Sequence, residues 1–215
     1  PPPVSQVTSK PVPQPKPPKP KLRTRPVPIR PDRFVWAFPP EPPFADEAVP
    51  MRNAPAVDRA GQCLLASQGR LFALVEEEGK AKVVWDYVIG CHVPGRITVA
   101  ADGSLRAHSA DGLLHAVSVE GKQVFPPAQV GEPLGWAAPL VDAAGNTWIS
   151  SYEGGLVRVD AAGKIAARRY FRSRRKLDSA GLLVGSTLYV GSEDPYVLAI
   201  DTSGDRGVVL WSPAA

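Results

Sequence analysis

Two ladders of glycine residues constrain the fold of this chain more than any other feature of its sequence. Successive members of each ladder are 40 to 42 residues apart, and the two ladders run in step. A unit of strand-like segments copied four times at this period predicts the blades of a β-propeller. The ladders are Gly61, Gly103, Gly145 and Gly185, and Gly79, Gly121, Gly163 and Gly204.

Each unit reads as four short strands joined by glycine turns, so the predicted domain is all-β, with about four four-stranded blades. An aromatic residue ends each unit and is expected to wedge between neighbouring blades: Trp85, Phe125, Tyr170 and Trp211. A small residue recurs in the third strand and should let adjacent sheets approach: Ala73, Ala116, Val159 and Ala199. We place the propeller at residues 34–215, with blades near 55–90, 91–131, 132–175 and 176–211.

Four blades raise the question of closure, because an open set of sheets exposes edge strands. Residues 33–38, Arg-Phe-Val-Trp-Ala-Phe, resemble the Val-Val-Leu-Trp end of the last unit and could supply one outer strand. We therefore expect either a small ring closed by residues 34–38 or a partial propeller completed by another chain.

Residues 1–33 form a different kind of segment, rich in proline and basic. The first 50 residues hold 17 of the 25 prolines, and residues 1–33 carry eight basic side chains against one acid. Proline favours extended polyproline II, which at ~3.1 Å per residue would reach roughly 100 Å. The arm is either a spacer or a recognition element for a protein partner, a membrane surface or a cell-wall polymer. Its candidate binding residues are Lys16, Lys19, Lys21, Arg23 and Arg25.

The composition of the arm adds a hint about location. Its alternating Lys-Pro resembles the proline-rich stretch of TonB-like proteins, which crosses the periplasm. The sequence has no apolar run of 18 residues and does not begin with Met. We therefore expect no bilayer-spanning segment, and either a removed targeting segment or a piece of a larger protein.

The residues that could carry chemistry have simpler explanations. Four aspartates, Asp58, Asp142, Asp160 and Asp201, sit at repeat positions and are expected to cap turns. The histidines His92, His108 and His115 form no metal-ligand pattern, and His115 is expected at a surface or half-buried strand position. No nucleophile-and-base set or nucleotide fingerprint is visible. We therefore expect no catalysis, no cofactor and no metal.

Two further features remain open. Cys63 and Cys91 lie in consecutive units and could form a disulfide. A basic segment is either a solvated outer strand or a site for a protein, a nucleic acid or anionic lipid, and of these a protein is preferred and nucleic acid is not expected. Its cations are Arg168, Arg169, Arg172, Arg174, Arg175 and Lys176.

The last unit resembles a known family. Leu198-Ala-Ile-Asp-Thr-Ser-Gly204 followed by Trp211 is similar to the blade signature of the PQQ-binding-like (pyrroloquinoline quinone-like) propeller repeat. That family includes enzymes, assembly factors and sensors. Its quinone dehydrogenases would require adjacent cysteines and a calcium site, whereas the two cysteines here are 28 residues apart. The resemblance therefore implies a non-enzymatic member.

The same blade resemblance extends to outer-membrane assembly lipoproteins, which bind partners through strand edges and inter-blade loops. It implies a periplasmic or otherwise extracytoplasmic scaffold, an accessory subunit that docks into a cell-envelope assembly through its propeller and its arm. The alternatives are the extracellular sensor domain of a receptor kinase and a fragment of a quinoprotein dehydrogenase.

Overall fold

The structure is a computed structural model of the 215-residue chain. It describes residues 54–67, 69–131, 136–177, 179, 181–193 and 197–211, without the side chains of Arg169, Arg172 and Trp211. The proline-rich arm and residues 34–38 lie outside this part. The described residues form strands and no helix, so none of them builds a helix that could cross a membrane.

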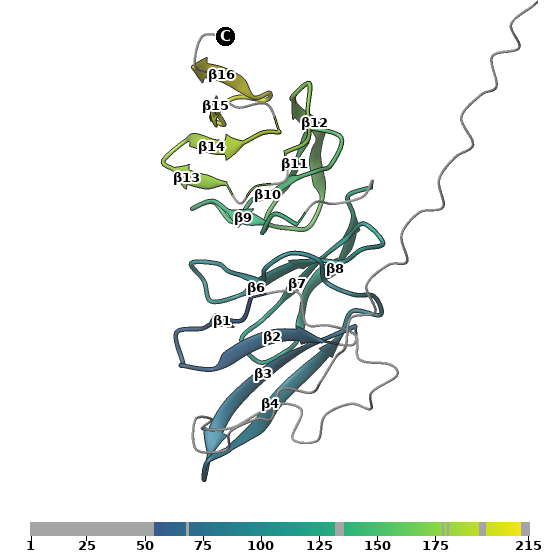
Figure 1. Cartoon of the computed structure of the whole chain (residues 1–215), viewed down its shortest axis with the longest axis vertical. Coiled ribbons are helices and arrows are strands. Elements are labelled where there is room, and N and C mark those ends of the chain that lie inside the picture. Colours follow the sequence, from purple (N-terminus) through teal and green to yellow (C-terminus); the bar gives the residue numbers. More distant parts are fainter. Residues whose placement is uncertain are drawn as a thin grey trace, which may run out of the picture. The chain divides into compact units, whose positions relative to one another are not determined.

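The described strands make four antiparallel four-stranded sheets (Figure 1). In each sheet the strands pair in chain order, as β1-β2-β3-β4 do in the first. The predicted fold class, an all-β propeller of four four-stranded units, is therefore confirmed. The strands are β1 (Ala56–Val57), β2 (Cys63–Ser67), β3 (Arg70–Glu77), β4 (Lys80–Val88), β5 (Thr98–Val99), β6 (Leu105–His108), β7 (Leu113–Val117), β8 (Gln123–Gln129), β9 (Leu140–Val141), β10 (Thr147–Ser150), β11 (Gly155–Val159), β12 (Ile165–Arg172), β13 (Leu182–Val184), β14 (Thr187–Gly191), β15 (Val197–Asp201) and β16 (Val208–Trp211).

Strand pairing defines equivalent positions in the four sheets. Leu64 pairs with Ala73 in the first sheet, and Arg106 pairs with Ala116 in the second. The third sheet pairs Trp148 with Arg158 at this position. The small residue predicted for the third unit was Val159, which is wrong by one residue. Because neighbouring residues of a strand point to opposite faces, Val159 lies on the other side of its sheet.

We call the face of a sheet that points toward the next sheet in the chain its front face, and the opposite one its rear face. Apolar residues on the front of each of the first three sheets pack against the rear of the following sheet. In the first contact, for example, Leu64 and Leu71 meet Leu105 and Val117. Three such clusters hold the described sheets together. None of them combines residues of the first sheet with residues of the fourth.

Three of the outer aromatic residues, Trp85, Phe125 and Tyr170, lie between consecutive sheets, as predicted, and the side chain of Trp211 lies outside the described part. The Trp85 indole donates to the Val119 carbonyl at 2.8 Å, and a Cβ added to Gly121 would lie 2.7 Å from the Trp85 ring. Tyr170 donates to the Gly204 carbonyl at 2.6 Å. In every sheet a register shift interrupts the pairing of the third and fourth strands. Such bulges re-aim side chains, here beside the outer aromatic residues.

The repeated aspartates cap turns, which confirms that prediction. The Oδ1 atom of Asp58 accepts the amides of Ala60 and Gln62 at 2.9 and 2.8 Å. Asp142 and Asp160 accept the amides two and four residues ahead in the same way, and Asp201 accepts that of Ser203. The carboxylates at the repeat positions are thus committed to local structure.

Candidate partner-binding surface

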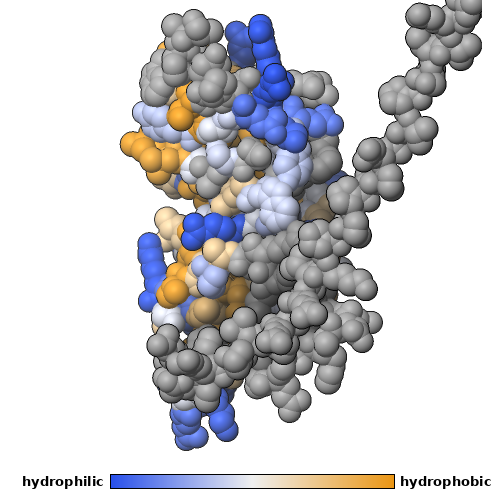
Figure 2. Space-filling model, in the orientation of Figure 1, coloured by the Kyte–Doolittle hydropathy of each residue, from blue (hydrophilic) through white to orange (hydrophobic). Residues whose placement is uncertain are grey.

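The basic segment of the sequence lies on β12 and on the loop that follows it. Figure 2 shows hydrophilic surface near the place where Figure 1 labels β12. Arg168, Arg174, Arg175 and Lys176 are all exposed. The side chains of Arg169 and Arg172 lie outside the described part, as do the five candidate binding residues of the arm. The candidate surface is therefore built from the four described cations.

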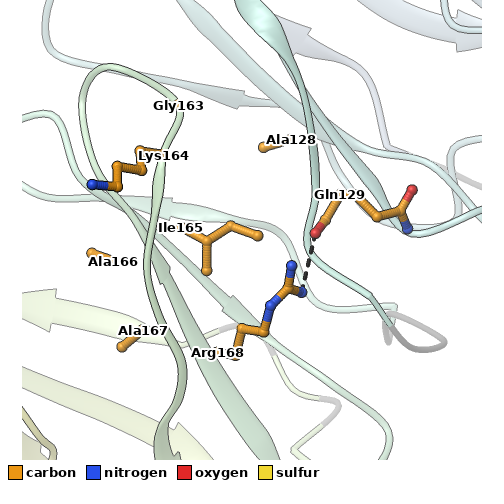
Figure 3. A pocket seen from close by; sticks show the side chains of 8 residues that line it. All are labelled: Ala128, Gln129, Gly163, Lys164, Ile165, Ala166, Ala167 and Arg168. Atoms are coloured by element: carbon orange, nitrogen blue, oxygen red, sulfur yellow. Dashed lines mark hydrogen bonds between the residues drawn. The ribbon is translucent and has the colours of Figure 1, made fainter.

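Arg168 joins the outer strands of the second and third sheets. Its Nη1 donates to the carbonyls of Gln129 and Val130, at 3.2 and 3.4 Å. Figure 3 shows Ile165 and Arg168 reaching from β12 toward β8, while Lys164 points away. The two strands border an open hollow of about 480 Å³, which residues 163–168 line together with Ala128 and Gln129. The guanidinium group of Arg168 is thus partly engaged in hydrogen bonds between the two sheets.

A second hollow, of about 320 Å³, lies at the loop after β12. Arg174, Arg175 and Lys176 line it together with Tyr152, Glu153 and Glu193. Lys176 is engaged inside the molecule, because its Nζ lies 3.2 Å from a Glu193 oxygen and 5.4 Å from the Tyr152 ring centre. Arg174 and Arg175 are exposed at the same hollow and can present positive charge to an external partner.

Backbone contacts hold this loop in place. The amide of Ser173 donates to the Gly154 carbonyl at 2.8 Å, and the amide of Glu193 donates to the Lys176 carbonyl at 3.1 Å. Gly154 has φ +77°, and a Cβ there would collide with the Arg175 carbonyl oxygen. The two arginines therefore stand on a fixed turn that requires glycine beneath it. A fixed loop loses less conformational entropy on binding than a flexible one.

The aromatic residues of the basic segment face inward. Tyr170 is 2% exposed, and its ring packs edge-on against Trp148 at 4.7 Å between centroids. Phe171 is half-buried against the same cluster. Burial raises the pKa of the Tyr170 phenol. These rings do not form an exposed stack for nucleic-acid bases, which removes one reason to invoke such a ligand.

One of the three histidines differs from expectation. His115 was expected at a surface or half-buried position, and the structure contradicts this, since its side chain is only 3% exposed. The ring meets Tyr87 edge-on, and its Nε2 lies 3.3 Å from the Ser109 hydroxyl. Burial lowers the pKa of His115, partly offset by the charge of Asp111. His108 is also buried, while His92 is exposed.

Ser109, His115 and Asp111 do not form a nucleophile set. The Ser109 hydroxyl donates to the Asp111 carboxylate at 2.5 Å, so the acid orients the serine and not the histidine. Ser109 belongs to a third ladder, Ser67, Ser109, Ser151 and Ser192, which sequence reasoning missed. The amides of Ser109 and Ser151 each donate to a carbonyl four residues ahead, closing the hairpin between second and third strands. The ladder was visible at the same spacing as the glycines.

A buried arginine was also missed. Arg106 is 3% exposed and donates to Thr147 Oγ1 at 3.2 Å, Ser104 Oγ at 2.7 Å and the Leu105 carbonyl at 3.0 Å. Its guanidinium lies 5.4 Å from the centre of the Phe125 ring. Burial lowers the pKa of Arg106, opposed by the charge of Asp102. The group bridges the second and third sheets and has no route to an external ligand.

The cysteines are free thiols in the structure, and both are half-buried. The disulfide that their positions allowed is therefore not present in it. Burial raises the pKa of Cys63, which disfavours the reactive thiolate. Within the described residues, no three His, Cys, Asp or Glu side chains gather as metal ligands would.

Comparison with solved structures identifies the fold. BamB from Moraxella catarrhalis superposes with a TM-score of 0.57 at 19% identity, over 75% of this chain and 49% of BamB. The chain thus spans about half the length of that protein. The computationally designed Ika4 protein superposes with a TM-score of 0.56 at 10% identity, over 73% of this chain and 94% of Ika4. No protein-family model and no curated protein sequence matches the chain. At these identities the likeness establishes a propeller-like fold and nothing finer.

Proposed function

We propose that this protein is a non-catalytic propeller that docks, as an accessory subunit, into a larger protein assembly of the cell envelope. The proposal includes an extracytoplasmic location. It rests mainly on the loop after β12, which presents Arg174 and Arg175 on a turn fixed by Gly154. Ser109, His115 and Arg106 make contacts inside the molecule, which favours a non-catalytic role. The propeller-like fold shared with BamB, and the blade resemblance to assembly lipoproteins, support the same role.

Arg174 and Arg175 fit an acidic protein partner, because exposed guanidinium groups bind carboxylates in paired geometry. Glu153 and Glu193 at the rim of the hollow limit how much negative charge a partner brings there. A protein surface with a few spaced carboxylates suits this mixture better than a uniformly anionic polymer does. The basic residues of the arm would add a second, extended contact to the same assembly.

The test is crosslinking of the tagged full chain in the organism that encodes it. In the Arg174→Glu/Arg175→Glu variant the amount of crosslinked partner should fall at least about tenfold, because two favourable charge contacts become repulsive. A matched control, Lys80→Glu/Lys122→Glu, changes the same charge at two other exposed positions and should crosslink like the wild type. Equal loss in both variants, or none in either, would contradict docking through this loop. Fractionation of the same cells tests the location independently.

A further inference from the structure

The fourth sheet has an apolar front face that the described part of the chain leaves uncovered. In the first three sheets this face packs against the next sheet. In the fourth, Leu182, Val184, Val197 and Val208 are 62, 57, 48 and 52% exposed, and none belongs to a buried cluster. Figure 2 shows hydrophobic surface near the position of β13 in Figure 1.

Strand register places these side chains on one face. In one row of the sheet, Leu182 pairs with Tyr189, and Tyr189 pairs with Ala199. In the next row, Val184 pairs with Thr187, Thr187 pairs with Asp201, and Asp201 pairs with Val208. Residues directly opposite one another in antiparallel strands point to the same side. The row of paired residues through Tyr189 is equivalent to the rows through Leu64, Arg106 and Trp148 in the other sheets. In those three sheets the front face is covered by the next sheet. The face therefore has the chemistry of an interface between sheets without a following sheet.

The rear face of the first sheet is its natural complement. In the three contacts within the chain, a front face always meets a rear face. The first sheet is preceded by no described sheet, and its rear carries Val57, Val83 and Val88 at 66, 42 and 58% exposure. Between these valines, Leu65 and Leu74 lie on the same face and are already buried. The exposed valines mark where further apolar surface remains to be covered.

We propose that the front face of the fourth sheet binds the rear face of the first sheet of a second copy of this chain, in both directions, so that two copies close into one assembly. The contact continues the front-to-rear packing already present three times in each copy. The four sheets match 49% of BamB, so two copies supply about the extent of that single propeller chain. Two-fold closure is also the commonest symmetry of soluble oligomers.

The test is the mass of the full-length protein in solution, measured by sedimentation over a wide range of concentrations. The wild type should reach the mass of two copies. Leu182→Arg/Val197→Arg should weaken association by roughly 100-fold or more, because it places charges in an apolar contact. Val57→Arg/Val83→Arg, on the other face, should weaken it to the same degree. All four positions are exposed in one copy, so the variants should keep the circular dichroism of the wild type.

A control and three outcomes make the proposal falsifiable. Val119→Arg/Val124→Arg adds the same charge at two exposed apolar positions, one in the turn between β7 and β8 and one on β8, and should leave association unchanged. A wild type that stays a single copy at every concentration would overturn the proposal. So would assemblies larger than two copies. Association that survives the Val57/Val83 change but not the Leu182/Val197 change would show a front-to-front contact, which also overturns it.

Discussion

The first and second sheets have the same strand arrangement but carry different side chains at equivalent positions. Leu64, Phe72 and Trp85 of the first sheet occupy the positions of Arg106, His115 and Phe125 in the second. The contact of the first sheet with the second is mainly aliphatic and aromatic and includes the His115 imidazole against Tyr87, whereas that of the second with the third contains the buried guanidinium of Arg106. The repeat thus fixes where a side chain points, and its chemistry varies as long as its polar atoms are satisfied.

The largest effect should come from moving the charge to the first sheet. In Leu64→Arg the new guanidinium would face Leu105 and Val117, which offer no side-chain acceptors. Burying an unpaired charge is among the most destabilising single changes, so we expect a loss of about 4 kcal/mol or more. Urea or thermal unfolding measured by circular dichroism tests this. A variant as stable as the wild type would show that the first contact is open to water.

The reverse exchange should be much milder. Arg106→Leu gives the second sheet the residue of the first, and a well-packed apolar side chain often replaces a buried charge at little cost. We expect a change within about 1 kcal/mol, and a loss of about 2–3 kcal/mol for Arg106→Ala, which also leaves a cavity. Denaturant midpoints of the two variants provide the comparison. Equal losses would mean that the hydrogen bonds to Ser104 and Thr147 dominate.

The outer aromatic residue offers a smaller test. Trp85→Phe gives the first sheet the residue that the second has at Phe125, and it removes the hydrogen bond to the Val119 carbonyl together with part of the ring surface. We expect a loss of about 1 kcal/mol. Trp85→Ala is the matched comparison and should cost more, because it also empties the space over Gly121. If both variants lost the same stability, the ring would contribute nothing beyond its hydrogen bond.

The smallest effect should appear in the pH dependence. Burial lowers the pKa of His115 in the folded state below its ordinary value of about 6.5. As pH falls through that ordinary value the unfolded chain binds the proton first, so stability falls until pH passes the lowered folded pKa. His115→Phe, the residue at the equivalent position of the first sheet, should reduce this dependence. Unfolding free energies of the wild type and the variant between pH 7 and pH 5 test this, and an unchanged pH dependence would contradict it.

The backbone was predictable from the sequence because glycine turns and capping aspartates act locally. Gly121 and Asp142, for example, predict their turns from the local sequence alone. The contents of the sheet contacts were less predictable, since burial depends on what a neighbouring unit brings. His115 looked unconstrained because its column of the repeat holds unlike residues, yet it is buried. Arg106 was not singled out, because nothing in its own segment shows that Thr147 of the next sheet lies within hydrogen-bond distance.

The candidate surface was predicted only in part. The run of cations singled out the segment that carries the candidate surface, and Tyr170 was correctly given the alternative role of an inter-sheet wedge. The sequence did not show that Arg168 and Lys176 also make contacts inside the molecule. Those contacts depend on Gln129, Tyr152 and Glu193, which come from other strands and loops. A sequence pattern cannot show which charged side chains make contacts within the folded chain.

The indole of Trp85 rests on Gly121, a residue of the following sheet and not of its own. A repeat unit of this kind therefore supplies an aromatic ring that packs on the following sheet, and a glycine turn on which the ring of the preceding sheet packs. Tandem copying of such a segment reproduces matched junctions on both flanks at once. Replacing a single unit with a foreign one would instead demand simultaneous changes in two neighbours, so lengthening is the easier evolutionary path for a chain of this kind.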